Sequence, residues 1–378
     1  MLLIKKIANC IHYILDIIII SYILLTRLFT NMNNRLTGLD LLRSIIMIFG
    51  PTFHASMLYS GAWGFDYSLN QNEWVADVLN LTHPFRMELF FIISGFFSAL
   101  LIKRKGASHF ISSRKKRLIR PTLLAIVITL PLIALEMYIL FDDKELRDYL
   151  SYKHLWFLIV LSQISMLLML APEKINRFAS YIAEKLDRLK WSFVFFLLFL
   201  AVCLSVAVSK VANILLPESV LSVSQIVPTI QYTPFFFIGM LLFFIKKDIN
   251  KNEAMILSAL YLLWYSVSVM FKGEYKIAMS LCQVFAVIAL CLALFYTFKN
   301  LNIKENKTIT ALSKLALPFY LTHLPILIFL GWIWSKSGIS RDPLLFLTYV
   351  IVLNIIFSFA ASILIRRSQK MSIFLGLA

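Results

Sequence analysis

The sequence predicts an all-α protein, a polytopic helical bundle that crosses a membrane about ten times. Hydrophobic residues make up 60% of the 378 residues, charged residues only 15%, and the mean hydropathy is +0.80. These values exclude an ordinary soluble domain. The apolar residues form runs of about twenty, enough for a helix to cross the hydrocarbon core. They do not alternate with polar residues as the strands of a membrane β-barrel do.

Ten apolar runs can be placed in order along the chain, separated by short charged connections. The predicted spans are 41–62, 84–102, 121–141, 154–171, 192–214, 229–245, 254–271, 275–298, 310–333 and 343–365. We assign residues 36–370 to one membrane domain. A separate extension over 1–35 precedes it, and a tail over 371–378 follows it.

The charges of the connections predict the orientation of the spans. The connection 103–120 contains eight Lys and Arg residues and no acid, and the alternate connections after it are also basic. The loop 63–83 contains three acids and no Lys or Arg, and 142–153 has more acids than bases. By the positive-inside rule, both ends of the ten-span core are cytoplasmic and 63–83 lies outside. Membrane orientation therefore explains the net charge of +17, and we predict no nucleic-acid partner.

Residues 1–35 fit this pattern poorly. Lys5, Lys6, Asp16 and Arg27 interrupt their apolar residues, and an eleventh span would place the two lysines outside. No small-residue cleavage site follows the isoleucine-rich segment, as a signal peptide requires. We expect that Met32 is the natural start, with an extra amphipathic or spanning helix as the alternative.

Arg43 and His54 in the first span are the principal candidate functional residues. Ionisable side chains inside membrane helices are costly and mark functional sites. Their separation of eleven positions corresponds to about 16 Å of helix, roughly half the hydrocarbon thickness. Pro51 is expected to kink the helix beside His54, and Asp40 lies at its entrance. A neutral imidazole can act as a general base; the alternative is a histidine that only bonds a neighbouring helix.

The second span contains Arg86 and Glu88 at a depth compatible with His54. Glu88 is expected to orient His54, and Arg86 to stabilise an oxyanion or bind an anionic acyl group. The alternative is an Arg86–Glu88 pair at the interface, although residues two apart on a helix do not face each other. Ser94 and Gly95 predict a position where another helix packs closely.

Three further groups of residues complete the candidate site. Arg114, Arg117 and Arg120 recur at helical spacing and suit a phosphorylated cytosolic donor, or else anionic lipid. We expect Arg43 to join them in binding the donor. An internal polar cavity lined by Asp40, His154, Trp156, Tyr320 and His323 is predicted. The loop tryptophans Trp63 and Trp74 suit an acceptor sugar, or else form part of an aromatic belt. The four cysteines have no zinc-site spacing, and we predict no metal.

Several of these segments together resemble the membrane acyltransferase-3 family. The matching pieces are Leu39-Asp40-Leu-Leu-Arg43 followed by ten residues and His54, Phe85-Arg86-Met, Arg114-Lys-Lys-Arg117-Leu-Ile-Arg120-Pro121, His154-Leu-Trp-Phe-Leu and Pro318-Phe-Tyr320-Leu-Thr-His323. They occur in the family's order between about 36 and 330. The Phe-Arg-Met and His-Leu-Trp-Phe-Leu pieces look most like the branch of the periplasmic glucan biosynthesis protein C, a glucan succinyltransferase.

The resemblance implies transfer of a succinyl or acetyl group from cytoplasmic acyl-CoA to a hydroxyl of an extracytoplasmic glycan. It places the protein in the bacterial inner membrane, with acyl-CoA as co-substrate and no permanently bound cofactor. Arg43 and His54 match the family's essential pair, and Arg117 and Arg120 match its basic run. Glu88 departs from the family pattern. Its expected partnership with His54 therefore follows only from its position in the second span, and not from the resemblance.

A proton-coupled secondary transporter is the alternative from another class. Arg43, His54 and Glu88 would then form a substrate site inside the membrane. Many transporter folds contain two related halves, and no internal repeat is visible in this sequence. A weaker alternative is a scaffold protein for glycan assembly.

Overall fold

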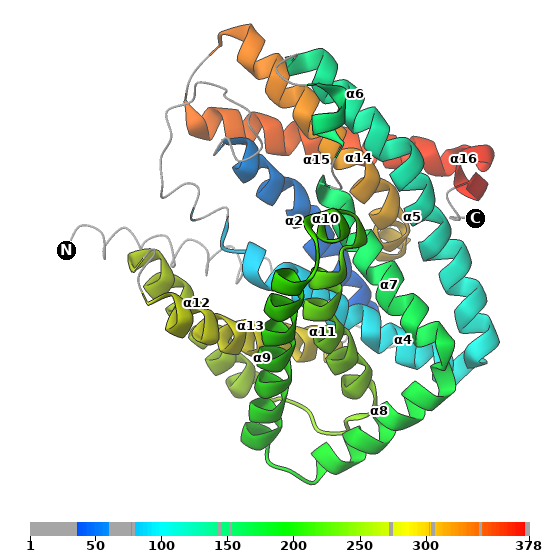
Figure 1. The fold of residues 1–378 in the computed structure, drawn as a ribbon, viewed down its shortest axis with the longest axis vertical. Helices are drawn as coiled ribbons and strands as arrows, with labels where there is room; N and C mark the ends of the chain where they lie inside the picture. The colour runs from blue at the N-terminus through cyan, green and yellow to red at the C-terminus, as the bar shows by residue number, and fades with distance from the viewer. Residues whose placement is uncertain are drawn as a thin grey trace. The chain divides into compact units, whose positions relative to one another are not determined.

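The computed structural model describes residues 36–59, 77, 80–141, 145–150, 153–271, 275–301, 303, 307–339 and 342–374. Within these residues the secondary structure is helical, without strands, as predicted (Figure 1). The helices are α2 (Thr37–Tyr59), α4 (His83–Arg114), α5 (Arg120–Leu124), α6 (Leu130–Phe141), α7 (Trp156–Leu170), α8 (Pro172–Asp187), α9 (Trp191–Leu215), α10 (Glu218–Ser224), α11 (Ile226–Phe244), α12 (Lys251–Met270), α13 (Lys276–Lys299), α14 (Lys307–Ser337), α15 (Pro343–Arg367) and α16 (Gln369–Phe374). Short π-helical turns, η1 (Lys115–Ile119) and η2 (Ala125–Thr129), and 3-10 turns, η3 (Leu146–Tyr149) and η4 (Lys153–Leu155), join some of them.

Eight helical stretches of the described chain are long and apolar enough to cross a membrane, or nine if the bent pair α7–α8 is one crossing. One of the eight is a 58-residue stretch from His83 to Leu140, whereas about 20 residues suffice for one crossing. Because this stretch breaks at Gly106, it can supply two crossings. With both adjustments, the structure accommodates the ten predicted spans.

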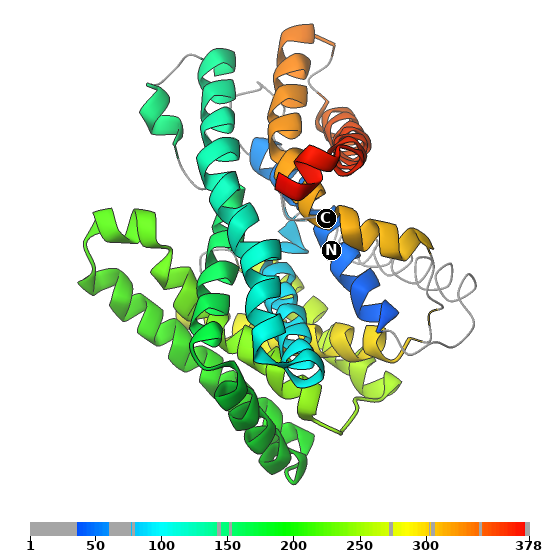
Figure 2. The ribbon, with the colours of Figure 1, turned by 90° about the vertical axis from the view of Figure 1, so that its right-hand side faces the viewer.

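The connection predicted between the second and third spans is itself helical. Residues 103–120 continue α4 and pass into η1 and α5, with non-helical angles only at Gly106 (φ 83°, ψ 169°). A positive φ of this kind is readily adopted by glycine alone. The chain changes direction near the C-terminal end of α4 and then continues through α5 to α6 (Figure 2). The basic residues of this connection are therefore held on a helix.

Another basic connection, predicted over 174–190, forms the amphipathic helix α8. It is bent by 94° from α7. Its buried side contains Asn176, Ala179 and Ala183, and it packs on α4 and α11. The charged residues of α8 lie mainly on the opposite, exposed side.

The chain divides into two compact units. The first contains residues 1–44 and 248–313, and the second contains 45–247 and 314–378. In the first unit, α12 packs against α13. The start of α2 also approaches the end of α13 so closely that a Cβ on Gly38 would overlap the carbonyl oxygen of Phe298.

In the second unit, α4 and α11 pack at very short range. A Cβ on Gly95 would overlap the Phe236 carbonyl oxygen, and one on Gly239 would overlap that of Ile92. These reciprocal glycine contacts confirm the close-packing position predicted at Ser94 and Gly95. Small residues allow helix backbones in membranes to approach in this way.

The second unit also contains a hydrophobic core built from α2, α6, α14 and α15. Ala55, Leu324, Leu327, Phe346 and Val350 are all fully buried in it. Two of them, Ala55 and Leu324, directly follow His54 and His323 in the chain. The core therefore fixes the two helix segments from which these histidines project.

Candidate active site

Three buried histidines from three elements of the second unit lie together. His54 belongs to α2, His154 to η4 and His323 to α14, and their exposed fractions are 8%, 2% and 2%. The ring centroids are 5.2 Å apart for His54 and His323, 5.1 Å for His154 and His323, and 6.2 Å for His54 and His154. The structure therefore unites the predicted base with two residues expected in the polar cavity.

Arg86 reaches the same part of α2 from α4. It is 6% exposed, and its Nη1 donates a hydrogen bond of 3.1 Å to the carbonyl oxygen of Phe49. Its guanidinium carbon also lies 4.8 Å from the ring centroid of Phe53, in a cation–π contact. Phe53 directly precedes His54 and its ring contacts the imidazole at 5.3 Å. Arg86 thus brings a buried positive charge to the histidine cluster.

Glu88 lies near Arg86 rather than against His54. Its Oε2 is buried without a hydrogen-bond partner in the described part of the protein. No hydrogen bond or ion pair between Glu88 and His54 is found among the described residues, so the structure does not bring the two together as expected. Arg86 is the cation whose charge acts on Glu88. No ion pair joins Glu88 to Arg86 in the described residues either, because residues two apart on a helix do not face each other, so the two charges interact without direct contact.

Tyr320 and Trp156 border the cluster in different ways. The Tyr320 hydroxyl donates a hydrogen bond to the backbone carbonyl of His154, and the two rings are 5.2 Å apart. Trp156 instead contacts Tyr232 of α11, with ring centroids 5.4 Å apart. Tyr320 therefore joins the histidines as predicted, whereas Trp156 packs toward α11.

Two residues at the site were not identified from the sequence. Tyr232 stacks on Phe91, with ring centroids 4.7 Å apart, and also contacts Trp156. Asn354 of α15 is fully buried, and its Nδ2 donates a hydrogen bond of 2.6 Å to the carbonyl oxygen of His323. Asn354 could have been identified from the sequence, because it lies in the middle of the last apolar span and polar side chains there usually form a hydrogen bond with another helix.

Arg43 and Asp40 lie in the first unit. The Arg43 guanidinium lies 3.4 Å from the Asp40 carboxylate and also donates a hydrogen bond to the Ser313 hydroxyl. The carboxylate and the hydroxyl hold the arginine side chain in one orientation. Asp40 accordingly pairs with the arginine at the start of α2.

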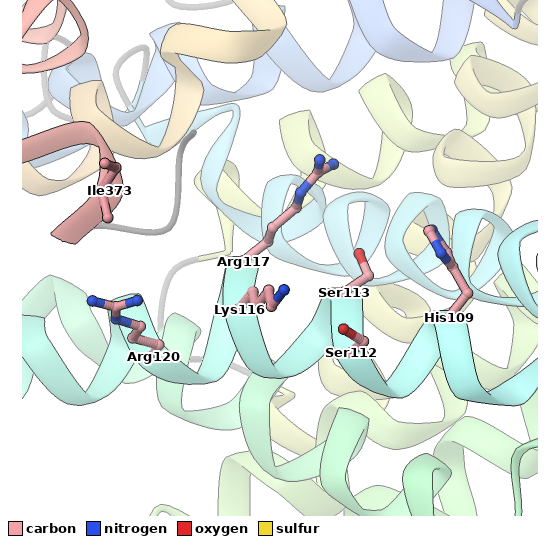
Figure 3. A pocket seen from close by; sticks show the side chains of 7 residues that line it. All are labelled: His109, Ser112, Ser113, Lys116, Arg117, Arg120 and Ile373. Carbon is pink, nitrogen blue, oxygen red and sulfur yellow. The ribbon is translucent and has the colours of Figure 1, made fainter. Parts of the chain in front are cut away.

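A basic pocket is formed where α4 passes into η1 and α5, and its volume is about 500 Å³. Its lining residues are His109, Ser112, Ser113, Lys116, Arg117, Arg120 and Ile373. Figure 3 shows Ile373 of α16 approaching the basic side chains of this helix. None of the lining residues is acidic, so the pocket is suited to an anionic ligand that bears phosphate groups.

The structure gathers two of the three predicted arginines in this basic pocket. Arg117 and Arg120 line it, whereas the Arg114 Nη2 donates a hydrogen bond of 2.5 Å to the Ser98 hydroxyl. The π-helical turn η1 lies between Arg114 and Arg120. Since a π turn contains more residues than an α turn, it changes the register of the residues on either side. Lys116 and His109 supply the further basic side chains.

Two further predictions concern the acceptor-binding tryptophans and a bound metal. Trp63 and Trp74, predicted to bind the acceptor, lie outside the described residues. Within the described part of the chain, no three His, Cys, Asp or Glu side chains are arranged to hold a metal ion.

The fold and the buried cluster define a multi-pass helical membrane protein with ionisable groups gathered inside its helices. The chain belongs to the acyltransferase-3 family, because residues 36–363 match its acyltransferase domain. This match contains every described residue of the histidine cluster and all of the basic pocket except Ile373.

Curated relatives with detectable similarity include two bacterial glucans biosynthesis proteins C. The protein of Salmonella typhi is 30% identical over 233 residues, which cover 57% of this chain and 59% of that protein. The protein of Escherichia coli (strain SMS-3-5 / SECEC) is 29% identical over 222 residues, covering 54% and 57%. The chain therefore spans less than two thirds of the length of these relatives. No solved structure matches the chain.

Proposed function

We propose that this protein is a membrane O-acyltransferase that moves a succinyl or acetyl group from cytoplasmic acyl-CoA to a hydroxyl of an extracytoplasmic glycan. The observation that carries the proposal is the buried cluster of His54, His154 and His323 beside Arg86, within a chain of the acyltransferase-3 family. The names of the curated relatives favour a glucan as the acceptor.

The basic pocket supplies the donor site in this proposal. The diphosphate and the ribose phosphate of CoA carry several negative charges, which Lys116, Arg117 and Arg120 would neutralise. The Ser112 and Ser113 hydroxyls line the same pocket. Arg43 is proposed as a further donor-binding residue, and within the first unit its contacts with Asp40 and Ser313 fix its orientation.

His54 supplies the base. As the glycan hydroxyl oxygen attacks the thioester carbonyl, His54 accepts the hydroxyl proton and a carbon–oxygen bond forms. The tetrahedral oxyanion then collapses, the carbon–sulfur bond breaks, and the proton on His54 passes to the departing thiolate of CoA. No acyl-enzyme intermediate is needed, and atoms and charge balance.

Arg86 supplies the electrostatic stabilisation of the oxyanion. A guanidinium has five N–H donors, of which the bond to Phe49 uses one. Because Arg86 is buried, its attraction to a developing negative charge is much stronger than in water. Glu88 contributes through Arg86, by balancing its charge before the oxyanion forms. Trp63 and Trp74 are proposed to stack on the acceptor sugar.

The test uses purified protein in lipid nanodiscs, succinyl-CoA and acetyl-CoA labelled in the acyl group, and a glucan oligosaccharide. The wild-type protein should transfer label to the oligosaccharide. His54→Ala and His54→Gln should elute as folded protein and lose the transfer, because neither side chain can accept the proton. Full activity in either variant removes His54 from the mechanism.

The same protein, reconstituted into sealed vesicles, tests the transporter alternative. Uptake of the labelled oligosaccharide or of succinate without any change in its chemical structure would favour transport. Transfer of the label from acyl-CoA, or hydrolysis of the thioester, favours the enzyme.

A further inference from the structure

The basic pocket follows one face of a helix. Its lining residues from His109 to Arg120 recur every three or four positions along α4, η1 and α5, and residues with this spacing lie on the same face. At a rise of about 1.5 Å per residue, the face is about 16 Å long. A pocket of about 500 Å³ along it suits an extended ligand better than a single phosphate group.

The chemical character of this face changes along its length. His109 supplies a planar aromatic ring at one end, and the hydroxyls of Ser112 and Ser113 follow about one turn later. Lys116 and Arg117 supply positive charges about two turns from the ring. An aromatic ring can stack on a nucleotide base, hydroxyls donate hydrogen bonds to a phosphate, and the cations bind a diphosphate. One ligand lying along the face would therefore meet these groups in a fixed order.

The other end of the pocket contains an apolar side chain. Ile373 is the one apolar residue among the described residues that line the pocket, and Figure 3 shows it at the Arg120 end. The helix α16 that carries it is fixed at its start, where the Met371 backbone N–H donates a hydrogen bond of 3.3 Å to the Ser368 hydroxyl. Ile373 itself is 49% exposed. Its apolar surface is therefore open to a ligand.

The Arg120 end of the pocket leads toward the helices of the candidate active site. η1 and α5 both pack against α7, and the hydroxyls of Thr122 and Ser162 share a hydrogen bond of 3.0 Å between α5 and α7. α7 begins two residues after His154 of the histidine cluster. His109 lies at the opposite end of the pocket (Figure 3). A donor that reacts at the cluster would therefore extend its thioester past the Arg120 end.

We propose that acyl-CoA lies along this face in one direction, with its adenine stacked on His109 and its pantetheine arm packed on Ile373. The orientation rests on the proposed function and deepens it, because each part of the donor receives its own residues. In CoA, the base, the ribose phosphate, the diphosphate and the arm follow one another in the same order as the ring, the hydroxyls, the cations and the apolar side chain of the pocket. His109 then reads the nucleotide, and Ile373 directs the arm toward the histidine cluster.

The test measures the binding of CoA and of its two halves to the purified protein in nanodiscs by titration calorimetry. Adenosine 3′,5′-bisphosphate carries the base, and 4′-phosphopantetheine carries the arm. The variants are His109→Ala, His109→Phe, which keeps an aromatic ring, and Ile373→Ser. Ser108→Ala and Met371→Ser are the matched controls, because both residues are exposed neighbours that are not among the lining residues.

We expect each variant to weaken the binding of one half only. His109→Ala should weaken adenosine bisphosphate and CoA about fivefold, the lower end for a base stacked on an aromatic ring, because His109 is exposed. His109→Phe should retain most of this binding. Ile373→Ser should weaken 4′-phosphopantetheine and CoA by about three- to tenfold, about half the effect in free energy of a fully buried isoleucine. The half not contacted should bind each variant as it binds the wild-type protein.

The reverse pattern, in which His109→Ala weakens only 4′-phosphopantetheine and Ile373→Ser only adenosine bisphosphate, would overturn the orientation and leave the proposed function standing. So would equal losses for both halves, or losses no larger than those of the controls. The expected pattern in a protein that transfers no acyl group would support the orientation and refute the proposed function. If Ile373→Ser does not fold, Ile373→Thr replaces it. No binding of CoA or either half to the wild-type protein would overturn the orientation.

Discussion

Removing the cations of the basic pocket should weaken the use of acyl-CoA without altering the chemistry at His54. The perturbations are Lys116→Ala, Arg117→Ala and Arg120→Ala, singly and combined. All three side chains line the pocket and are exposed, so solvent screens their contacts with phosphate. Exposed pairs of this kind change a binding constant by about two- to fivefold each. The single variants should therefore raise the KM for acyl-CoA by that factor, and the triple variant by roughly eight- to a hundredfold if the effects multiply.

The assay compares acyl-CoA with the same acyl group on pantetheine, which lacks the nucleotide phosphates. The KM for acyl-pantetheine should be high in every protein and insensitive to the three substitutions. Rising salt should increase the KM for acyl-CoA in the wild-type protein and much less in the triple variant. Lys115→Ala is the matched control, because Lys115 is an exposed neighbour of Lys116 and is not among the lining residues. An equal rise in KM for acyl-CoA and acyl-pantetheine, or an equal rise in the KM for acyl-CoA in the Lys115→Ala control, would refute the assignment of this pocket to the donor.

Three further predictions follow from the packing and the site. Gly239→Ala should lower the free energy of unfolding by about 1–3 kcal/mol, because the added Cβ would overlap the backbone of Ile92. Unchanged thermal unfolding in detergent would contradict the close contact between α4 and α11. Gly106→Ala should lower the free energy of unfolding by about 1–2 kcal/mol because of the positive φ alone, since no described atom lies within 4 Å of the added Cβ. The same thermal unfolding measurement checks this, and an unchanged unfolding temperature would mean that the bend at Gly106 is absent. Glu88→Gln should retain more acyl transfer than Arg86→Ala, measured as kcat, because Glu88 acts only through Arg86. The reverse order would restore Glu88 as the direct partner of His54.

The spans could be predicted from the sequence because membrane crossing depends on length and hydropathy, which are local properties. All ten predicted runs correspond to helices of the structure. The connection 103–120 was predicted as a loop between spans because its charges mark a membrane surface. Charge does not exclude a helix, and only Gly106 interrupts the helical backbone there. The orientation of the spans stays a prediction.

The histidine cluster was predictable in part. His54, His154, Tyr320 and His323 are unusual residues for apolar spans, so each could be chosen from its surroundings alone. Which of them meet depends on helix rotation and on packing between elements far apart in the sequence. For that reason Glu88 was assigned to His54 although it lies by Arg86, and the bond from Asn354 to His323 was missed.

The basic pocket shows how a local irregularity changes a predicted surface. Spacing of three residues places Arg114, Arg117 and Arg120 on one face of a regular helix. The π turn η1 interrupts that regularity, and Arg114 turns to Ser98. Ile373 joins the pocket from the other end of the chain, and no local pattern in the sequence predicts such a contact.

The central claim is that acyl groups pass from CoA to a glycan through His54. The most direct measurement uses sealed membrane vesicles with the cytoplasmic face outward, a glucan oligosaccharide inside and labelled acyl-CoA outside. Mass analysis of the enclosed glycan should show the mass increase of one acyl group with the wild-type protein and none with His54→Gln. An unmodified enclosed glycan with the wild-type protein, or equal modification with His54→Gln, would contradict the claim.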